Sequence, residues 1–369
     1  MNVFDYLDKY GGLSFGEMPF NEVDALMLTE LSYLDLEKIC PYYVDGKGQI
    51  PIKSLNLATV KELGRRTTDA PNCETLIRKM ARSARFSKVG IGLGHAIRDE
   101  RRVIQYASFT FFLPNDVLFI AYRGTDTTLL GWKEDFQLAY QDTIASHHEA
   151  LGYAKQVLSW YPGRKFYLGG HSKGGNLASY VTLHLEEKWI PYLVKAYSFD
   201  GPGFRKKPEK FEERKNLIEK FLTQEDMIGC FFNLIEKPNI IYSSSKIGGG
   251  HNPFGWQIDI PNKVFKRAPD RSAGSYAGEK AFAEVLSQTS REDIQLAADA
   301  LFRIYWDCET VLDLGLNLLP SFLKRESALS DYTPEEREKV KAFFEKFFLA
   351  LSKRIVLKKP KKEKKPASE

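Results

Sequence analysis

The chain has 369 residues, of which 43% are hydrophobic and 27% charged, and its formal net charge is +5 at pH 7. This composition is typical of a globular protein with two domains, or with one large domain and an appendage. The sequence predicts no membrane-spanning helix, because it has no run of about 18 uncharged apolar residues. The N-terminus has no signal-sequence pattern, so we expect a cytoplasmic protein.

The positive charge is concentrated at the C-terminal end. Residues 353–369 contain eight Lys or Arg and two Glu, so the rest of the chain carries a net charge of −1. The basic balance therefore gives no reason to expect a nucleic acid partner.

The four cysteines are far apart and form no CxxC pair: Cys40, Cys73, Cys230 and Cys308. This spacing matches neither a metal site nor a disulfide framework. We expect buried free thiols and no bound metal.

Helices and strands alternate over the first three quarters of the chain. Apolar spacing predicts a helix over residues 22–39 with Asn21 as its cap, and residues 57–87 also have a helical pattern. The later pattern predicts strands at 101–113, 117–125, 165–170, 194–201, 238–245 and 256–260, and helical stretches at 134–162, 176–187 and 205–222. Such alternation predicts an α/β fold with a mostly parallel sheet and helices on both faces.

From about residue 285 the sequence predicts helices only. Thr333-Pro334-Glu335-Glu336 is a capping box with proline at the first helical position. After Leu357 the sequence has low complexity. We expect a core domain over residues 1–284 with an N-terminal helical lead-in, a helical extension over 285–357 and a disordered basic tail over 358–369.

The segment YLGGHSKGGNLASY, residues 167–180, joins a predicted strand to a predicted helix. It contains Gly170-x-Ser172-x-Gly174, the spacing of a nucleophile elbow, in which a strained turn lifts a serine oxygen clear of the sheet. The same pattern is compatible with a glycine-rich turn in which Ser172 caps the helix. The strand before and the helix after are the context that the elbow requires, so Ser172 is the candidate nucleophile.

In enzymes built on this elbow, an acid and then a histidine follow the serine along the chain. Only His184 and His251 follow Ser172. His184 lies along the helix that leaves the elbow, about 18 Å from the serine at a rise of 1.5 Å per residue. The candidate base is therefore His251, in the glycine-rich loop GGGHNPFGW.

Two carboxylates between Ser172 and His251 sit where the chain leaves regular structure. Asp226, in TQEDMIG, lies in the usual place of the acid, one predicted strand before the histidine, and we favour it. Asp200, in SFDGPG, can instead begin a tight turn, where Asp is favoured for its own hydrogen bonds. Asp200 therefore stays as the alternative acid.

Acyl transfer also needs hydrogen-bond donors aimed at the developing oxyanion. One expected donor is the backbone N–H of Lys173, the residue after the nucleophile. The other is the N–H or hydroxyl of Thr125, in the loop that follows a predicted strand. A salt bridge between Arg123 and Asp126 in this loop is the structural alternative, and it is compatible with that role.

The segments IAYRGTD, WKEDF, GGHSKGGNLA, SFDGPGF, EDMIG and GGGH resemble the lipase class 3 branch of the α/β-hydrolases, and more closely a group of bacterial proteins within that branch. The resemblance covers roughly residues 20–260. It implies an α/β-hydrolase fold with a Ser–Asp–His triad at Ser172, Asp226 and His251, and an oxyanion hole at Thr125. SFDGPGF departs from the lipase pattern, which usually lacks an aspartate there, so Asp200 remains open.

These residues predict a serine hydrolase that cleaves carboxylic esters of small acyl or lipid type through an acyl-enzyme, with no cofactor. The alternative is a non-catalytic protein of the same fold that binds an acyl ligand or a partner. Residues 127–132 are the candidate lid. The basic tail beside a Phe-rich helix predicts peripheral contact with anionic membranes. The sequence gives no oligomeric state.

Overall fold

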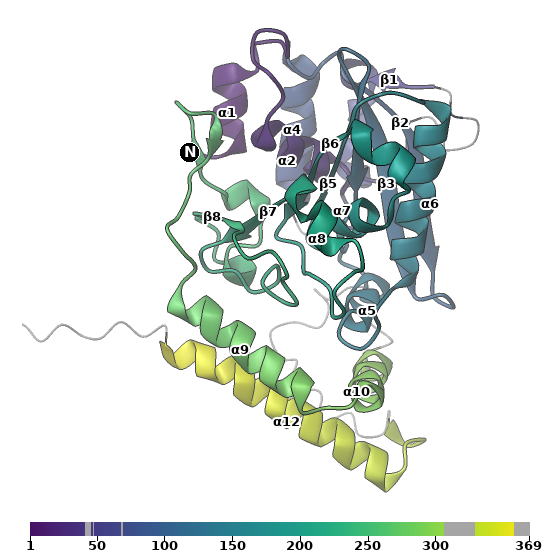
Figure 1. Ribbon diagram of the computed structural model, residues 1–369, viewed down its shortest axis with the longest axis vertical. Helices are drawn as coiled ribbons and strands as arrows, with labels where there is room; N and C mark the ends of the chain where they lie inside the picture. The colour runs from purple at the N-terminus through teal and green to yellow at the C-terminus, as the bar shows by residue number, and fades with distance from the viewer. Residues whose placement is uncertain (41–45, 47, 68, 306–328, 358–369) are drawn as a thin grey trace, which may run out of the picture.

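The computed structural model describes residues 1–40, 46, 48–67, 69–305 and 329–357 (Figure 1). Its centre is an eight-stranded sheet in which the strands follow their order in the chain. The strands are β1 (Ile50–Pro51), β2 (Gly90–Asp99), β3 (Ile104–Leu113), β4 (Val117–Tyr122), β5 (Phe166–His171), β6 (Leu193–Phe199), β7 (Ile218–Thr223) and β8 (Asn239–Ile241). Strands β1 to β4 pair antiparallel, and β4 to β8 pair parallel.

Helices cover both faces of this sheet (Figure 1). One face packs against α1 (Val3–Tyr10), α2 (Glu22–Leu31) and α4 (Ala70–Arg82), and the other against α6 (Ala145–Trp160) and α7 (Lys173–His184). The strands that these helices cover are almost entirely buried, as a sheet between two helical layers requires. The expected α/β fold with helices on both faces is confirmed.

The N-terminal helices belong to the core of the sheet domain. Asn21 caps α2, as its sequence predicted, by accepting the N–H groups of Val23 and Asp24. The Asp24 carboxylate in turn binds Arg85, and both side chains are fully buried. A buried charge without its partner is strongly unfavourable, so this pair ties α2 to the chain that enters β2.

The remaining segments are short or peripheral. The short helices are α3 (Val60–Leu63), α5 (Leu129–Gln137) and α8 (Phe211–Arg214), with single 3-10 turns at Leu36–Lys38, Ile52–Ser54, Leu57–Thr59, Glu187–Tyr192, Lys215–Leu217, Ile247–Gly249 and Pro253–Gly255. A two-stranded ribbon pairs β9 (Ile258–Asp259) with β10 (Val264–Phe265). Among the described residues, none of the helices is long and apolar enough to cross a bilayer.

The C-terminal helices form a second, smaller core. Helices α9 (Ala273–Ser287), α10 (Arg291–Ile304) and α12 (Pro334–Leu357) share one apolar cluster, and α9 and α12 lie along each other below the sheet domain (Figure 1). The capping box at α12 is confirmed, since Thr333 N–H donates to Glu336 and Glu336 N–H donates back to Thr333 Oγ1 at 3.2 Å. The expected boundary at residue 285 falls inside α9.

One predicted element is wrong. The charged stretch 205–222 was expected to be helical, but only Phe211–Arg214 forms an α-helix, and Ile218–Thr223 is the strand β7. The charged residues of this stretch indicated an exposed helix, but one of them, Lys220, is buried in the sheet with 4% of its surface exposed. Asp226 therefore follows a strand that the sequence pattern did not reveal.

The cysteine prediction is confirmed where the structure covers it. Cys40, Cys73 and Cys230 are free and buried. Cys308 lies outside the described residues, as does the basic tail over 358–369.

Candidate active site

Ser172 sits in the turn between β5 and α7, in a conformation that few residues adopt. Its φ is 57° and its ψ −129°, in the region that side chains other than glycine normally avoid. A Cβ atom at Gly170 would lie 2.0 Å from the Gly174 carbonyl oxygen, and one at Gly174 would lie 2.2 Å from the Tyr122 oxygen. These two glycines let the backbone fold back sharply enough to make a nucleophile elbow at Ser172.

The candidate base, His251, is hydrogen-bonded to Asp200 rather than to Asp226. His251 Nδ1 lies 2.6 Å from Asp200 Oδ2. Asp200 directly follows β6, has a φ of 52° and is fully buried. Because an ionised carboxylate only accepts hydrogen bonds, Nδ1 carries the proton, and Nε2 is left as the basic nitrogen.

The two groups of this pair differ in charge at neutral pH. Burial lowers the pKa of His251 to about 4, so its imidazole is neutral at pH 7. Burial raises the pKa of Asp200 to about 6, although the positive charge of Lys220 lowers it. Above that pH the carboxylate is ionised and can stabilise a positive charge on His251.

The structure contradicts the preference for Asp226 as the acid beside the histidine. Asp226 Oδ1 accepts the N–H groups of Ile228 and Gly229 at 3.1 and 3.0 Å, and Oδ2 accepts the N–H of Cys230 at 2.6 Å. Its oxygens therefore close the turn after β7. Asp200 Oδ1 is buried without a hydrogen-bond partner, and Asp200 Oδ2 is the oxygen that contacts His251.

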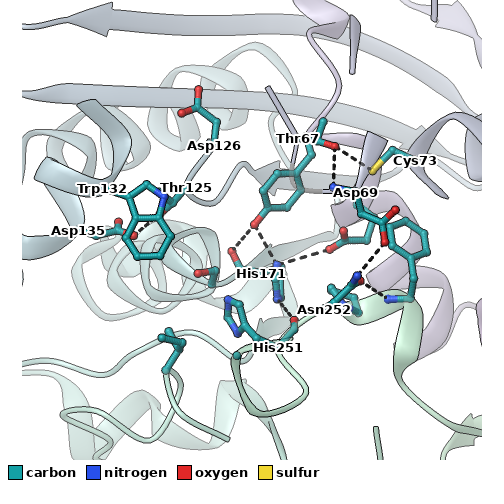
Figure 2. A pocket seen from close by; sticks show the side chains of 17 residues that line it. Thr67, Asp69, Cys73, Thr125, Asp126, Trp132, Asp135, His171, His251 and Asn252 are labelled. Carbon is teal, nitrogen blue, oxygen red and sulfur yellow. Dashed lines mark hydrogen bonds and ion pairs between the residues drawn. The ribbon is translucent and has the colours of Figure 1, made fainter. Parts of the chain in front are cut away.

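His171, the residue before the serine, fastens the loop that carries His251. Its Nε2 donates to the backbone oxygen of His251 at 2.9 Å, and its Nδ1 accepts from the Tyr33 hydroxyl at 2.9 Å. The centroids of the two imidazole rings lie 4.5 Å apart. Figure 2 shows the two side chains next to each other. Burial lowers the pKa of His171 well below its usual value, so this side chain stays neutral and acts as a support.

The two expected oxyanion donors lie on either side of Ser172. Lys173 begins α7, and the first N–H groups of a helix have no acceptor within the helix. Its ammonium group is directed away, to Glu134 Oε2 at 2.7 Å. Thr125 lines the same cavity as Ser172. Its hydroxyl donates to Asp135, which leaves its N–H as the free donor.

The loop that holds Thr125 comes unusually close to the elbow. A Cβ atom at Gly124 would lie 2.4 Å from the His171 oxygen and 2.1 Å from the Tyr33 hydroxyl. The structural alternative was a salt bridge between Arg123 and Asp126, and these two residues are not paired. Arg123 binds Asp35 and Glu37 at 3.1 Å each, and Arg98 binds Asp126 at 3.4 Å.

Ser172 and His251 line one cavity of about 240 Å³, together with Thr125, Asp135 and Trp132 (Figure 2). A second cavity, of about 220 Å³, is lined by Ser172 but not by His251. The candidate lid, residues 127–132, forms the start of α5, where Thr128 caps the helix by accepting the N–H of Gly131. Trp132 lines both cavities and is 38% exposed.

Sequence reasoning missed the residues that support the site from a distance. Tyr33 and Asp135 come from α2 and α5 regions with ordinary helical patterns, which carry no signal of a catalytic neighbour. His171 was set aside because it precedes the serine. In the described part of the chain, His, Cys, Asp and Glu side chains form no cluster that could hold a metal ion.

A sheet that presents a strained serine between β5 and α7, with a His–Asp pair beside it, defines an α/β-hydrolase of the lipase-like branch. The chain belongs to the Mbeg1-like family, whose sequence model matches residues 80–303. A search of curated proteins finds no match.

Solved structures with a similar fold include fungal lipases. One fungal lipase is 12% identical, with a TM-score of 0.39 and 73% of this chain and 88% of that chain covered. A mutant MDLA from Penicillium cyclopium has the same identity and TM-score, with 73% and 89% covered. A structure described for an unusual buried polar cluster in a family of fungal lipases is 13% identical, with a TM-score of 0.39 and 72% and 87% covered. Similarity at this level carries no information on chemistry.

Proposed function

We propose that the protein is a serine hydrolase that cleaves carboxylic esters through an acyl-enzyme intermediate. The proposal is carried by one observation: a strained Ser172 lines the same cavity as His251, whose Nδ1 lies 2.6 Å from the buried carboxylate of Asp200. A turn that merely joins a strand to a helix needs neither backbone strain at a serine nor a buried carboxylate behind a histidine.

In the first half of the reaction, Ser172 Oγ attacks the ester carbonyl carbon while its proton moves to His251 Nε2. The tetrahedral intermediate collapses, the bond from carbon to the alcohol oxygen breaks, and His251 returns the proton to the departing alcohol. A water molecule then attacks the acyl-enzyme, gives its proton to the same nitrogen and releases the carboxylic acid. His251 finally protonates Ser172, so one ester and one water yield one acid and one alcohol.

Asp200 and the two backbone donors stabilise the charges of this sequence. Asp200 fixes the tautomer of His251 and balances its positive charge in the intermediate. The N–H groups of Lys173 and Thr125 bind the oxyanion, where a single donor of this kind is typically worth about 10²–10³ in kcat. The Thr125 hydroxyl, engaged with Asp135, holds the loop in place.

The test is covalent labelling by a fluorophosphonate, which reacts with activated serines. The wild-type protein is expected to be labelled, and Ser172→Ala to be unreactive. Ser179→Ala is the matched control, because Ser179 is a buried serine in the same helix α7 and donates only to the Gly175 oxygen. Equal labelling of wild type and Ser172→Ala contradicts the proposal and favours the non-catalytic alternative, a protein that binds an acyl ligand.

We also propose that the basic tail contacts anionic membranes. Phe343 and Phe344 of α12 are buried in the C-terminal core and are not available to a membrane. Binding then rests on charge alone, at about 1 kcal/mol for each basic residue near the surface. Co-sedimentation with anionic vesicles should fall when residues 358–369 are removed and when salt is added; binding that resists both changes contradicts the proposal.

A further inference from the structure

The two cavities that meet at Ser172 differ in which catalytic group they contain. The first holds His251, and the second does not. In an ester hydrolysis the departing alcohol must stand next to the histidine, because the histidine returns the proton to it. The acyl part of the substrate therefore extends into the second cavity, which we call the acyl cavity.

The C-terminal helices build the far wall of the acyl cavity. Phe282 of α9 and Phe347 of α12 line it, together with Trp132 of α5. Phe282 stacks on Phe231 with ring centroids 4.0 Å apart, and Phe347 meets Phe282 edge to face at 6.2 Å. These ring contacts connect the sheet domain to α9 and then to α12, so both side chains are fixed in place.

The acyl cavity suits a hydrocarbon chain of limited length. Its charged lining groups are Asp135 of α5 and Lys173 of α7. The Asp135 carboxylate accepts the Thr125 hydroxyl, and the ammonium group of Lys173 is bound to Glu134. The cavity of about 220 Å³ has room for an alkyl chain of medium length. Each methylene that it buries should raise affinity about fourfold.

We propose that the helical extension is part of the active site, and that Phe282 and Phe347 set the length of the acyl chain, with an optimum near octanoyl. This inference rests on the proposed function, because it assigns the cavities from the direction of the reaction. It assigns α9 and α12 the role of the acyl wall, so the extension helps to select the substrate.

The experiment uses the full chain and p-nitrophenyl esters of butanoate, octanoate, dodecanoate and hexadecanoate. We expect kcat/KM to rise to octanoyl and fall beyond it. Phe282→Trp fills the cavity and should lower the octanoyl-to-butanoyl ratio at least about tenfold, whereas Phe347→Ala opens it and should raise the dodecanoyl-to-octanoyl ratio. Leu286→Ala is the control, since Leu286 is buried in α9 without lining the cavity, and it should change neither ratio.

A binding measurement separates this inference from the proposed function. Octanoate should bind Ser172→Ala, as measured by calorimetry, and adding Phe282→Trp should weaken that binding about tenfold or more. If no ester is hydrolysed but this binding pattern holds, the cavity assignment stands and the catalytic proposal fails. If esters are hydrolysed and neither ratio moves in Phe282→Trp and Phe347→Ala, the inference is wrong. If Phe347→Ala does not fold by circular dichroism, Phe347→Leu replaces it as the variant that enlarges the cavity.

Discussion

Strands β6 and β7 lie side by side, and each leads to a buried aspartate, yet the two aspartates make different contacts. Asp200, directly after β6, gives an oxygen to the imidazole of His251. Asp226, in the turn after β7, gives its oxygens to three backbone N–H groups. One carboxylate supports a base and the other closes a turn. The partner of a carboxylate, and not its place at a strand end, therefore decides its role.

The largest effect that we predict from this comparison is on the rate of Asp200→Asn. The amide keeps the shape of the carboxylate, but it holds the wrong tautomer of His251 and cannot balance the positive charge of the imidazolium. We therefore expect kcat to fall by roughly 10⁴, the loss typical of an Asp-to-Asn change in the catalytic triad of a serine protease. The variant should remain folded by circular dichroism. Retention of most activity would reassign the acid and contradict the role given to Asp200.

Asp226→Asn should mainly reduce stability. An asparagine oxygen can still accept from Ile228 and Gly229, but its NH₂ group would face the N–H of Cys230, which Asp226 Oδ2 now accepts at 2.6 Å. A buried donor left without an acceptor costs about 1–3 kcal/mol. Urea unfolding should show this loss, while kcat per folded molecule stays within about tenfold of wild type. A rate loss as large as that of Asp200→Asn would contradict the comparison.

The stability difference between wild type and Asp226→Asn should depend on pH. Burial and the neighbouring Asp200 raise the pKa of Asp226 to about 7, so the folded protein holds this proton more tightly than the unfolded chain does. The resulting stability is fully present below the ordinary pKa of an aspartate and is lost as pH rises through about 7.

Asparagine cannot ionise, so the advantage of wild type over Asp226→Asn should shrink as pH rises from about 5 to about 8, by at most ~1.4 kcal/mol per pH unit. Urea unfolding of both proteins across this range is the measurement. An advantage that grows with pH would mean that the three backbone donors outweigh burial and keep Asp226 ionised.

The smallest effect is expected at Cys230. Its backbone N–H binds Asp226, but this donor is unchanged when the side chain is shortened. Cys230→Ala should therefore cost about 1 kcal/mol, the average for a single substitution, and leave the rate unchanged. A larger loss would show that the buried thiol itself contributes to the stability of the turn.

Local patterns were enough to predict the elbow and several helix ends. The Gly-x-Ser-x-Gly spacing at Ser172, the Asn21 cap and the Thr333 capping box each depend on residues within one turn of the chain, and the structure contains all three as predicted. Such features need no knowledge of tertiary packing, because short-range hydrogen bonds and backbone sterics define them.

The choice between Asp200 and Asp226 depends on packing that a sequence does not display. It requires knowing that Ile218–Thr223 is a strand despite its charges, and that the loop with His251 lies beside the end of β6. Contacts with His171 and Tyr33, which are far from His251 in the chain, hold the loop in this position. A single sequence gives no measure of such long-range contacts, so it could not decide which of the two aspartates lies beside His251.

The strain at Ser172 also bears on the order of folding. A backbone in this region costs about 1–3 kcal/mol, and the close contacts that impose it come from the Tyr122 carbonyl at the end of β4 and from Gly174 in α7. The elbow can form only after β4, β5 and α7 have assembled, so an unfolded or partly folded chain carries an ordinary, unreactive serine. The rate at which Ser172 is labelled should therefore report on this assembly. As the urea concentration rises, we expect the labelling rate and the far-ultraviolet circular dichroism signal to fall over the same range.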